Sequence, residues 1–498
     1  MEALTQSAEI LFTTPAIFMA CIGVAWGILG GALPGISPSI TMALLLPFTY
    51  ALDPISAIVL LASTYVGAEY GGSIPAVLIR TPGTNAAAAT VIDGYEMNRQ
   101  GKAGLALGIS LYSGVIGSLF GLAMLVLLSE PLSRVALSFR PPSYFALGIL
   151  GLSVIATLSG GSLVKGLIAG TLGLMVATIG TDPVTGGNRF TFGTADLLGG
   201  IEPVMIMVGL FAVSELLVQA SRREPEIRVE SRARIEFPGW RLARRLLPSQ
   251  MIGNVIGTFE GIMPGAGGTV ASFLAYNEAR RWSRHKEEFG KGSPEGIAAP
   301  ETANNTVTGT AIIPLLAFGI PGSNSTAILL GGFLIHGIAV GPMVFVRSPE
   351  VVYGLYGGLF VASLAQLLIG VVMMAPCIWL VNRPRAYLNA FIYGLIFSGV
   401  YSIHQSLFDL AIVLAAGVVG FAMRMLKIPF LPTVLGLVLG YLVESNYRRS
   451  LVISGGDHMI FLTDPISLGL LIAAALFLAG SLGKSLYDSL RPAPAAGP

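Results

Sequence analysis

The chain has 498 residues, of which 53% are hydrophobic and 11% are charged, and its formal net charge is +2. Soluble globular proteins carry roughly 25% charged residues, so this composition indicates a membrane protein and excludes a soluble enzyme. We expect no nucleic-acid partner. Apolar windows of about 20 residues, enough for a helix to cross a hydrocarbon layer of about 30 Å, recur along nearly the whole chain and predict roughly ten to twelve transmembrane segments.

The first half, residues 1–220, is a succession of such apolar stretches and is expected to form an N-terminal transmembrane repeat. Its beginning, "MEALTQSAEILF", has acidic residues and no basic region, so the first apolar stretch is expected to be a retained membrane segment, not a cleaved signal. Cys21 and Cys377 lie in apolar sequence far from any C-x-x-C pattern, which predicts neither a disulfide nor a metal site.

Residues 221–248 are expected to form a basic cytoplasmic linker. The stretch 221–245 contains eight arginines against four glutamates. Short Arg-rich loops remain on the cytoplasmic side because moving their charges across the membrane is unfavourable. The second half, residues 249–498, then resumes the apolar pattern as a C-terminal transmembrane repeat.

The apolar block 249–276 is expected to be a re-entrant hairpin. Basic residues flank it on both sides, at Arg244 and Arg245 before it and at Arg280, Arg281, Arg284 and Lys286 after it. The positive-inside rule therefore places both ends in the cytoplasm. The tip would be "GIMPGAGG", residues 261–268. Because unsatisfied peptide groups in lipid cost several kcal/mol each, this tip should line a cavity.

The two halves share the points at which the hydrophobic pattern is interrupted. "GALPG" at 31–35 matches "GIMPG" 230 residues later, and "SIPAVLIRTPGTN" at 73–85 matches "IIPLLAFGIPGSN" 239 residues later. Paired segments broken by Gly and Pro in two halves indicate the binding site of a secondary transporter. We therefore predict an all-α polytopic membrane protein of two repeated halves, related by inverted topology, with re-entrant hairpins and broken helices.

The Pro-Gly pairs explain how such a site could bind an anion. Proline and glycine end one helix, and the helix that follows presents free N–H groups and the positive end of its dipole. The polar residues that follow are Thr84, Asn85, Ser323 and Asn324. They could cap their own helices, donate to a carboxylate, or supply oxygens to a small cation such as Na⁺.

A polar stretch, "APETANNTVTGT" at 299–310, leads directly into apolar sequence. Its carboxylate, carboxamides and hydroxyls could line a transport path or tie helices together by hydrogen bonds. The first half offers Glu69, Arg80 and Asp93 near its break. Arg80 could be the counter-charge of an anionic substrate, or it could extend to the membrane interface.

Motifs of soluble enzymes are absent or incomplete. "LAGSLGKS" lacks the first glycine of a phosphate-binding loop, and the sequence contains no H-E-x-x-H or G-x-S-x-G. We expect no enzymatic activity and no covalently bound cofactor. Two alternatives to a transporter stay open, namely an ion or anion channel, and a membrane-embedded enzyme that uses Glu69, Asp93 and Glu301.

Four stretches together resemble a known family. They are residues 31–50 and 71–108, "GIMPGAGGTVASFLAY", and residues 296–338. They are similar to the large membrane subunit, the TctA type, of the bacterial tripartite tricarboxylate transporters. The resemblance implies a secondary transporter in the cell inner membrane that takes up tricarboxylates or related organic acids. It also implies an ion gradient, usually Na⁺ and alternatively H⁺, a small membrane subunit of the TctB type and a periplasmic solute-binding protein of the TctC type.

The breaks and the resemblance together give the expected site. The expected substrate-binding residues are Pro34, Gly35, Arg80, Pro82, Gly83, Thr84, Asn85, Pro264, Gly265, Pro321, Gly322, Ser323 and Asn324. The expected Na⁺ ligands are Asn304, Asn305 and Thr302. Further family signatures fall on Asp93-Gly94-Tyr95 and Pro300-Glu301. Family members often carry small or apolar residues at positions 80 and 85, so Arg80 and Asn85 could tune the substrate, or Arg80 could lie outside the site.

Overall fold

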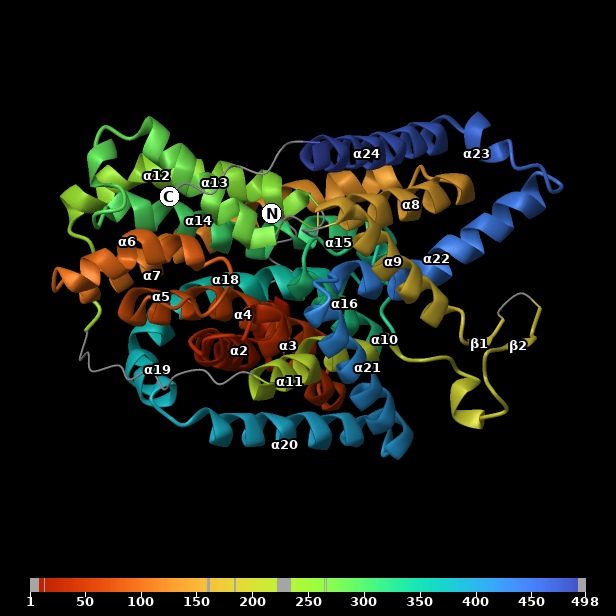
Figure 1. Cartoon of the computed structure of the whole chain (residues 1–498), viewed down its shortest axis with the longest axis horizontal. Coiled ribbons are helices and arrows are strands. Elements are labelled where there is room, and N and C mark those ends of the chain that lie inside the picture. The colour runs from red at the N-terminus through yellow and green to blue at the C-terminus, as the bar shows by residue number, and fades with distance from the viewer. Residues whose placement is uncertain are drawn as a thin grey trace. The chain divides into compact units, whose positions relative to one another are not determined.

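The computed structural model describes residues 9–12, 14–158, 162–182, 185–221, 234–263, 265 and 267–490, and for residues 385–386 and 484–490 it describes the backbone alone. Within this part of the chain, helices form nearly all of the structure (Figure 1). The exception is a small antiparallel pair of strands, β1 (Gly180–Thr181) and β2 (Asn188–Arg189).

Six helical segments among the described residues are long and apolar enough to cross a membrane. They are Ala103–Ala136 (α7), Pro141–Leu158 (α8), Pro203–Ser221 (α10 and α11), Pro349–Val372 (α18), Leu407–Met425 (α21) and Pro465–Gly483 in α24. Four shorter apolar helical segments accompany them, namely Ala16–Gly31 (α2), Pro38–Ala51 (α3 and a 3₁₀ turn), Leu163–Ala177 (α9) and Asn324–Ile335 (α16). An all-α polytopic membrane fold is confirmed, while the count of ten to twelve crossings stays a prediction.

The chain forms two compact units that cut across its sequence halves. The first contains residues 1–136 and 204–421, and the second contains residues 137–203 and 422–498. The expected domain boundaries at residues 220 and 249 were drawn from the sequence alone. The last part of the expected linker is helical, because α12 begins at Trp240.

In the first unit, the segments that the sequence comparison paired fold into helices of matching order. The first set is α4 (Pro54–Gly71), α5 (Ser73–Ile79) and α6 (Ala88–Arg99), and the second is α14 (Pro294–Thr310), α15 (Ile312–Phe318) and α16. Helices α5 and α15 have 7 residues each, and α6 and α16 have 12 each. The inverted relation of the two halves stays a prediction.

Glycines allow the helices of each set to approach closely. Gly23, Gly27 and Gly31 of α2 face backbone oxygens of α4, so that a methyl group at any of them would overlap that helix. On α12 (Trp240–Ile262), Gly253, Gly257 and Gly261 occupy the equivalent positions 230 residues later and pack against α14 and the residue after it. Small residues permit this close approach of membrane helices.

The long helices pack reciprocally between the two sets. Helix α7, which follows the first set, lies along α14, and α18, which follows the second, lies along α4. Helices α12 and α13 (Gly267–Trp282) also pack against each other across the turn that contains Gly265. A helical hairpin therefore exists where the sequence predicts one, while its re-entrance into the membrane stays a prediction.

The other helices of the first unit are shorter or lie late in the sequence. They are α17 (Val344–Arg347), α19 (Met374–Val381), α20 (Arg385–His404) and the turns η1 (Leu46–Ala51), η3 (Gly209–Val213) and η4 (Lys286–Glu288). The η3 turn is a π-helix inserted between α10 (Pro203–Val208) and α11 (Ser214–Ser221).

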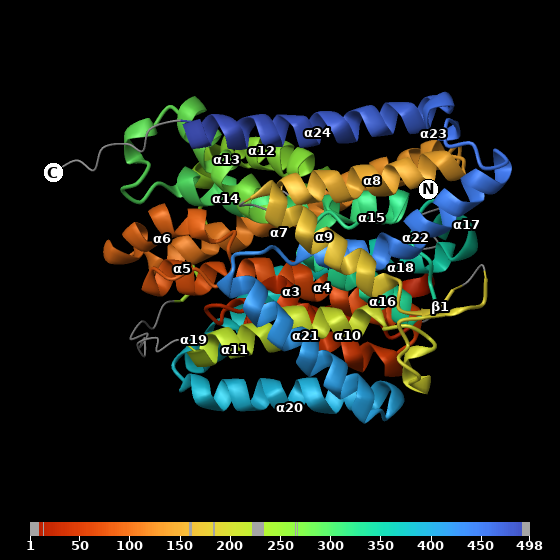
Figure 2. The same cartoon turned by 45° about the vertical axis from the view of Figure 1, so that its right-hand side comes forward.

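The second unit consists of α8, α9, α22 (Leu431–Ile453), α23 (Ile460–Thr463), α24 (Pro465–Leu490) and the strand pair with η2 (Ala195–Leu197) (Figure 2). Helix α22 packs along α9, where Gly173 faces the Thr433 carbonyl and Gly436 faces the Gly170 carbonyl. At one end Arg189 and Arg448 bind the acids Asp182 and Glu444.

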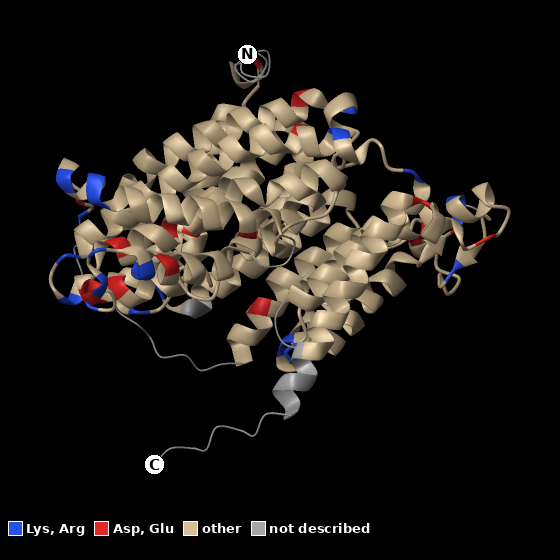
Figure 3. Cartoon of the chain, turned by 90° about the horizontal axis from the view of Figure 1, so that it is seen from above, with Lys and Arg blue, Asp and Glu red and all other residues tan. Residues whose placement is uncertain are grey.

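Charged residues gather at the ends of helices and in loops, and the long helices are almost free of them (Figure 3). Glu69, Asp93 and Glu301 are exceptions, because they lie in helices of the first unit and are at most 5% exposed. These three carboxylates define the region of the candidate site.

Candidate functional site

The first Pro-Gly break lies between α5 and α6. Helix α5 ends at Arg80, whose φ of 59° is left-handed. Gly83 then packs against the Gly31 carbonyl and donates its N–H to the Gly72 carbonyl at 3.0 Å. The Thr84 hydroxyl is buried and accepts from the Ala87 N–H at 3.3 Å, whereas the next side chain, Asn85, is exposed.

The second break, between α15 and α16, repeats this arrangement. Helix α15 ends at Gly319, with a φ of 74°. Gly322 packs against the Gly261 carbonyl and accepts a hydrogen bond from the Gly265 N–H at 3.0 Å. Ser323 is buried and forms a capping box with Thr326, and Asn324 is exposed. In each break, therefore, a buried hydroxyl is followed by an exposed carboxamide.

The structure brings the two Pro-Gly motifs of each half together. The end of α2, at Gly31, contacts the first break, and the end of α12, at Gly261, contacts the second. Gly35 is exposed and lies near Glu215 and Gln219 of α11, and Pro34 is half-buried. Pro264 lies outside the described residues.

Polar side chains on α4 and α14 connect the two breaks. Glu69 accepts a hydrogen bond from Asn304 Nδ2 at 3.0 Å through its Oε2 atom, and the Thr84 hydroxyl of the first break lies near the same carboxylate. Tyr65 lies one helical turn before Glu69, and Ser323 and Ser325 of the second break lie near its hydroxyl. We call Tyr65, Glu69, Thr84 and Asn304 the bridging cluster.

Asn304 has an unused acceptor in the bridging cluster. The residue is 1% exposed, and its Oδ1 atom has no hydrogen-bond partner among the described residues. Within the same part of the chain, no Lys, Arg or His forms an ion pair with Glu69. A buried carboxylate and a buried carbonyl oxygen thus lie together with more acceptors than donors, and this arrangement fits a cation.

Both carboxylate oxygens of Glu301, in contrast to Asn304 Oδ1, accept hydrogen bonds from protein side chains. Its Oε2 atom accepts hydrogen bonds from Ser73 at 2.9 Å and Ser110 at 3.0 Å, and its Oε1 atom accepts one from Thr90. Ser110 also donates to Ser73 at 2.8 Å. Because these hydroxyls come from α5, α6 and α7, Glu301 ties α14 to three helices around the first break.

The other two expected Na⁺ ligands hold helices together. Asn305 donates to the Glu301 carbonyl at 3.0 Å, and its Oδ1 atom accepts from Gln366 of α18 and Ser118 of α7. Thr302 donates to the Ser113 carbonyl of α7 at 3.3 Å. The predicted roles of Asn305 and Thr302 in ion binding stay predictions, but their oxygens already have protein partners, whereas that of Asn304 does not.

Asp93, in the signature Asp93-Gly94-Tyr95, anchors a loop. Its Oδ1 atom accepts three backbone N–H bonds of 2.8 Å from Gly290, Gly292 and Ser293, and its Oδ2 atom accepts from Tyr276 at 2.9 Å. Burial raises the pKa of Asp93 and outweighs these hydrogen bonds, which favour the charged form. Asp93 therefore holds in place the loop that precedes α14.

Arg80 lies at the exposed end of α5, with its guanidinium 5.7 Å from the centre of the Tyr95 ring. Its contact with an aromatic face is a cation–π interaction. The guanidinium makes no ion pair within the described residues, so it is available to an external anion. Its role in substrate binding stays a prediction.

The hydroxyl partners of Glu301, and also Tyr65, are not among the site residues predicted from the sequence. Ser73, Thr90 and Ser110 look like any of the many Ser and Thr residues in membrane helices, and only the packing shows that they meet at Glu301. Tyr65 carried a usable signal, because it lies one turn before Glu69 on the same helical face.

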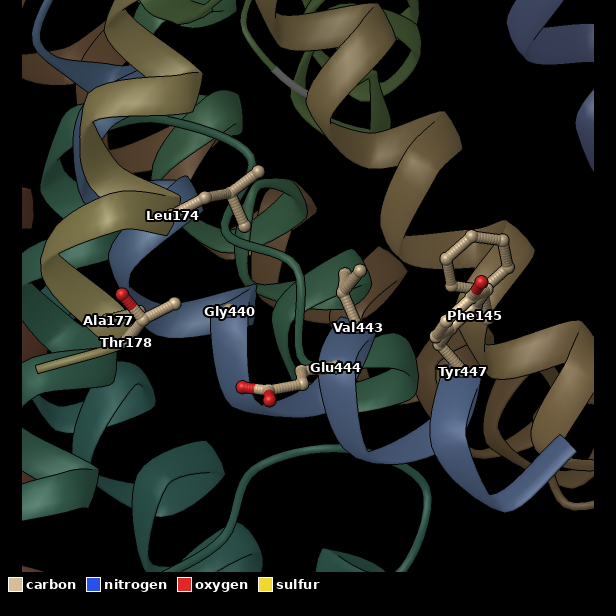
Figure 4. Close-up of a pocket in the computed structure, with 8 residues that line it drawn as sticks. All are labelled: Phe145, Leu174, Ala177, Thr178, Gly440, Val443, Glu444 and Tyr447. Atoms are coloured by element: carbon tan, nitrogen blue, oxygen red, sulfur yellow. The ribbon is translucent and has the colours of Figure 1, made fainter. Parts of the chain in front are cut away.

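The second unit contains a separate cavity of about 300 Å³ (Figure 4). Its lining is mostly apolar, with Phe145, Leu174, Val443 and Tyr447, and the carboxylate of Glu444 lies at its edge. Glu444 pairs with Arg189 at 2.7 Å and with Arg448 at 2.6 Å. A pocket with this lining does not suit a polyanionic substrate, because neither arginine lines it.

No group of three His, Cys, Asp or Glu side chains that could hold a metal lies together in the described part of the chain.

The model of the tripartite tricarboxylate transporter TctA family matches residues 17–435. The chain belongs to this family. Two proteins of Agrobacterium vitis are similar to it. One, described as an uncharacterized 52.8 kDa protein in the TAR-I ttuC' 3' region, is 37% identical over 471 residues, which cover 94% of this chain and 93% of that protein. The other, described as an uncharacterized protein in the TAR-II ttuC' 3' region, is 34% identical over 215 residues, 43% of this chain and 89% of that protein.

Membership confirms the resemblance seen in the sequence motifs. This TctA chain is a multi-pass membrane protein and a subunit of a tripartite tricarboxylate transporter. The family is a transporter component, which points away from an enzyme.

Proposed function

We propose that this TctA chain is the ion-coupled transport subunit that takes up tricarboxylates or related organic acids across the cell inner membrane. It would receive its substrate from a periplasmic binding protein of the TctC type and act together with a small TctB-type membrane subunit. The observation that supports this proposal is the bridging cluster, in which Glu69 lies beside the first break, Tyr65 lies beside the second, and Asn304 retains an unpartnered buried oxygen.

The substrate carboxylates would bind at the two breaks. Helices α6 and α16 begin there, and the positive ends of their dipoles favour an anion. Asn85 and Asn324 are exposed, and neither makes a side-chain hydrogen bond within the described residues. Their amide groups are therefore available to donate to a carboxylate. Two such breaks would suit a substrate with at least two carboxylates.

The coupling cation would bind between Glu69 and Asn304. Burying an unpaired carboxylate is unfavourable unless a cation or a proton compensates its charge. Na⁺ at this position would be coordinated by the Glu69 carboxylate and the nearby Thr84 hydroxyl, and by Asn304 Oδ1 once the carboxamide, whose Nδ2 atom donates to Glu69, has turned. These are oxygen ligands, as a hard cation prefers.

The same contacts provide a physical basis for coupling. Thr84 belongs to the first break and Asn304 to α14, so a cation that binds both also fixes the first break relative to α14. Tyr65 of α4 lies near Ser323 and Ser325, so a movement of α4 would also move the second break. The cation would thus order both anion-binding helix ends before the substrate binds, and alternating access would follow from movement of one part of the bundle.

The test compares two buried asparagines. Asn304→Ala removes the unpartnered oxygen, and Asn254→Ala removes an equally buried carboxamide whose Oδ1 atom accepts from Thr306 at 2.9 Å. Both variants would be assayed in proteoliposomes with the two partner subunits, and citrate uptake would be measured against Na⁺ concentration at fixed pH and against pH at fixed Na⁺.

We expect Asn304→Ala to raise the Na⁺ concentration for half-maximal uptake by about tenfold or more, as typically follows loss of a group that holds a metal site. Asn254→Ala should leave this concentration unchanged, even if it lowers the yield of folded protein. Unchanged Na⁺ dependence in Asn304→Ala would contradict the cation site. Uptake that responds to pH and not to Na⁺ would assign the cluster to a proton.

A further inference from the structure

The end of α13 carries a basic cavity that the transport site does not use. The cavity has a volume of about 490 Å³ and is lined by Asn277, Arg280, Arg281, Lys286 and Glu287. It is an open depression of the surface, because all five side chains are exposed. Arg280 and Lys286 form no ion pair within the described residues, and Arg281 has a 3.6 Å contact with Glu278.

An exposed apolar stripe leads along α13 into this cavity. Val270 and Leu274 are exposed and lie on the same helical face as Asn277 and Arg281, since these positions are four, three and four residues apart. Phe273 is exposed beside them. One continuous surface therefore changes from apolar to basic within about three helical turns.

Trp282 marks the place of this change. It is 71% exposed, and the Arg281 guanidinium lies 5.8 Å from the centre of its ring. Exposed tryptophans at the end of an apolar helical surface are typical of the level of the lipid headgroups. The basic flank of α13 also belongs on the cytoplasmic side by the positive-inside rule.

We propose that this surface binds an anionic phospholipid of the cytoplasmic leaflet. The phosphate of the headgroup would lie in the cavity among Arg280, Arg281 and Lys286, and the acyl chains would cover Val270, Phe273 and Leu274. Three basic side chains against Glu287 and the Glu278 carboxylate that contacts Arg281 leave a net positive charge that attracts an anion, and the adjoining stripe selects an anion that carries hydrocarbon chains. This inference does not depend on the identity of the transported substrate.

The test uses the purified full chain and native mass spectrometry, with equal amounts of phosphatidylglycerol and phosphatidylcholine that have the same acyl chains. The cavity variant is Arg280→Gln/Arg281→Gln/Lys286→Gln. The control variant, Arg241→Gln/Arg244→Gln/Arg284→Gln, removes the same charge from exposed residues of the same region that do not line the cavity.

We expect the wild-type chain to retain phosphatidylglycerol in preference to phosphatidylcholine. The cavity variant should lose about fivefold in this preference for each charge removed, and the control variant should keep it. An equal loss in both variants would show a general charge effect and overturn the proposal. So would equal retention of the two lipids by the wild type, or displacement of phosphatidylglycerol by an equal concentration of glycerol phosphate, which would show a site for the free anion.

Discussion

The two Pro-Gly breaks have the same backbone arrangement, but their hydroxyl side chains have different hydrogen-bond partners. At the second break, Ser323 and Thr326 cap each other's backbone groups, and Ser323 also lies near the Tyr65 hydroxyl of α4. At the first break, α6 has no side-chain cap at its N-cap residue Ala87, and the Thr84 hydroxyl, which accepts from the Ala87 N–H, also lies next to Glu69 of α4. The hydroxyl of the first break therefore lies beside a carboxylate and that of the second beside a tyrosine, which favours the first as the proposed ion-binding break.

The left-handed residue before each break shows the same contrast. The second break uses Gly319, which adopts a positive φ without a steric penalty, whereas the first uses Arg80. An unfavourable backbone conformation in a functional region is usually retained for a reason. Under the proposed function, the first break would retain polar groups for a ligand, whereas the second would mainly stabilise the bundle.

The largest effect is expected from the glycine inside each break. A methyl group at Gly83 would overlap the Gly31 carbonyl and lie 2.8 Å from the Gly72 Cα atom, whereas at Gly322 it would meet the Gly261 carbonyl at 2.9 Å and the Ala311 carbonyl at 3.0 Å. We expect Gly83→Ala to lower the free energy of unfolding by about 3 kcal/mol and Gly322→Ala by about 1 kcal/mol.

Thermal unfolding of both purified variants in detergent, followed by circular dichroism, would measure this difference. Equal destabilisation would show that the two breaks are equally tightly packed, and the contrast drawn from their contacts would then be wrong.

The sequence was sufficient to predict where the chain breaks but not which side chains would meet. Proline and glycine act on their own backbone, so the positions 82–83 and 321–322 could be read directly as helix ends. Asn304 and Asn305 are adjacent, yet their side chains point about 100° apart around α14. One therefore faces Glu69 and the other faces Gln366, and no local pattern distinguishes these directions.

The grouping of the helices into two compact units could not be predicted from the sequence either. Residues 137–203 and 422–498 are far apart in the chain, and they join because Gly173 and Gly436 let α9 and α22 approach closely. Similar small residues occur throughout the apolar stretches, so their partners follow from packing alone. The hydrophobic pattern predicts the helices, and long-range contacts decide how these helices are grouped.

A pair of hydroxyl variants would sharpen the comparison between the breaks. Thr84→Val should raise the Na⁺ concentration for half-maximal uptake by about tenfold, because Thr84 lies next to Glu69. Ser323→Ala should lower the free energy of unfolding by about 1 kcal/mol through loss of an N-cap, with little change in Na⁺ dependence. Uptake and thermal unfolding would be measured for both variants. The opposite assignment of effects would make the second break the ion-binding one.

The smallest effect is expected at Arg80, which can be replaced by glycine, the residue at the equivalent position 319 of the second break. Arg80→Gly should raise the free energy of unfolding by about 1 kcal/mol, because glycine tolerates the left-handed conformation that arginine does not. The loss of the cation–π contact with Tyr95 would offset part of this gain.

A role of Arg80 in substrate binding would be tested separately, by measuring the Michaelis constant for carboxylate uptake. A higher constant with unchanged Na⁺ dependence would assign Arg80 to the substrate. An unchanged constant, with Arg80→Lys as a control that keeps the charge, would place the guanidinium outside the site and leave Asn85 as the exposed donor of the first break.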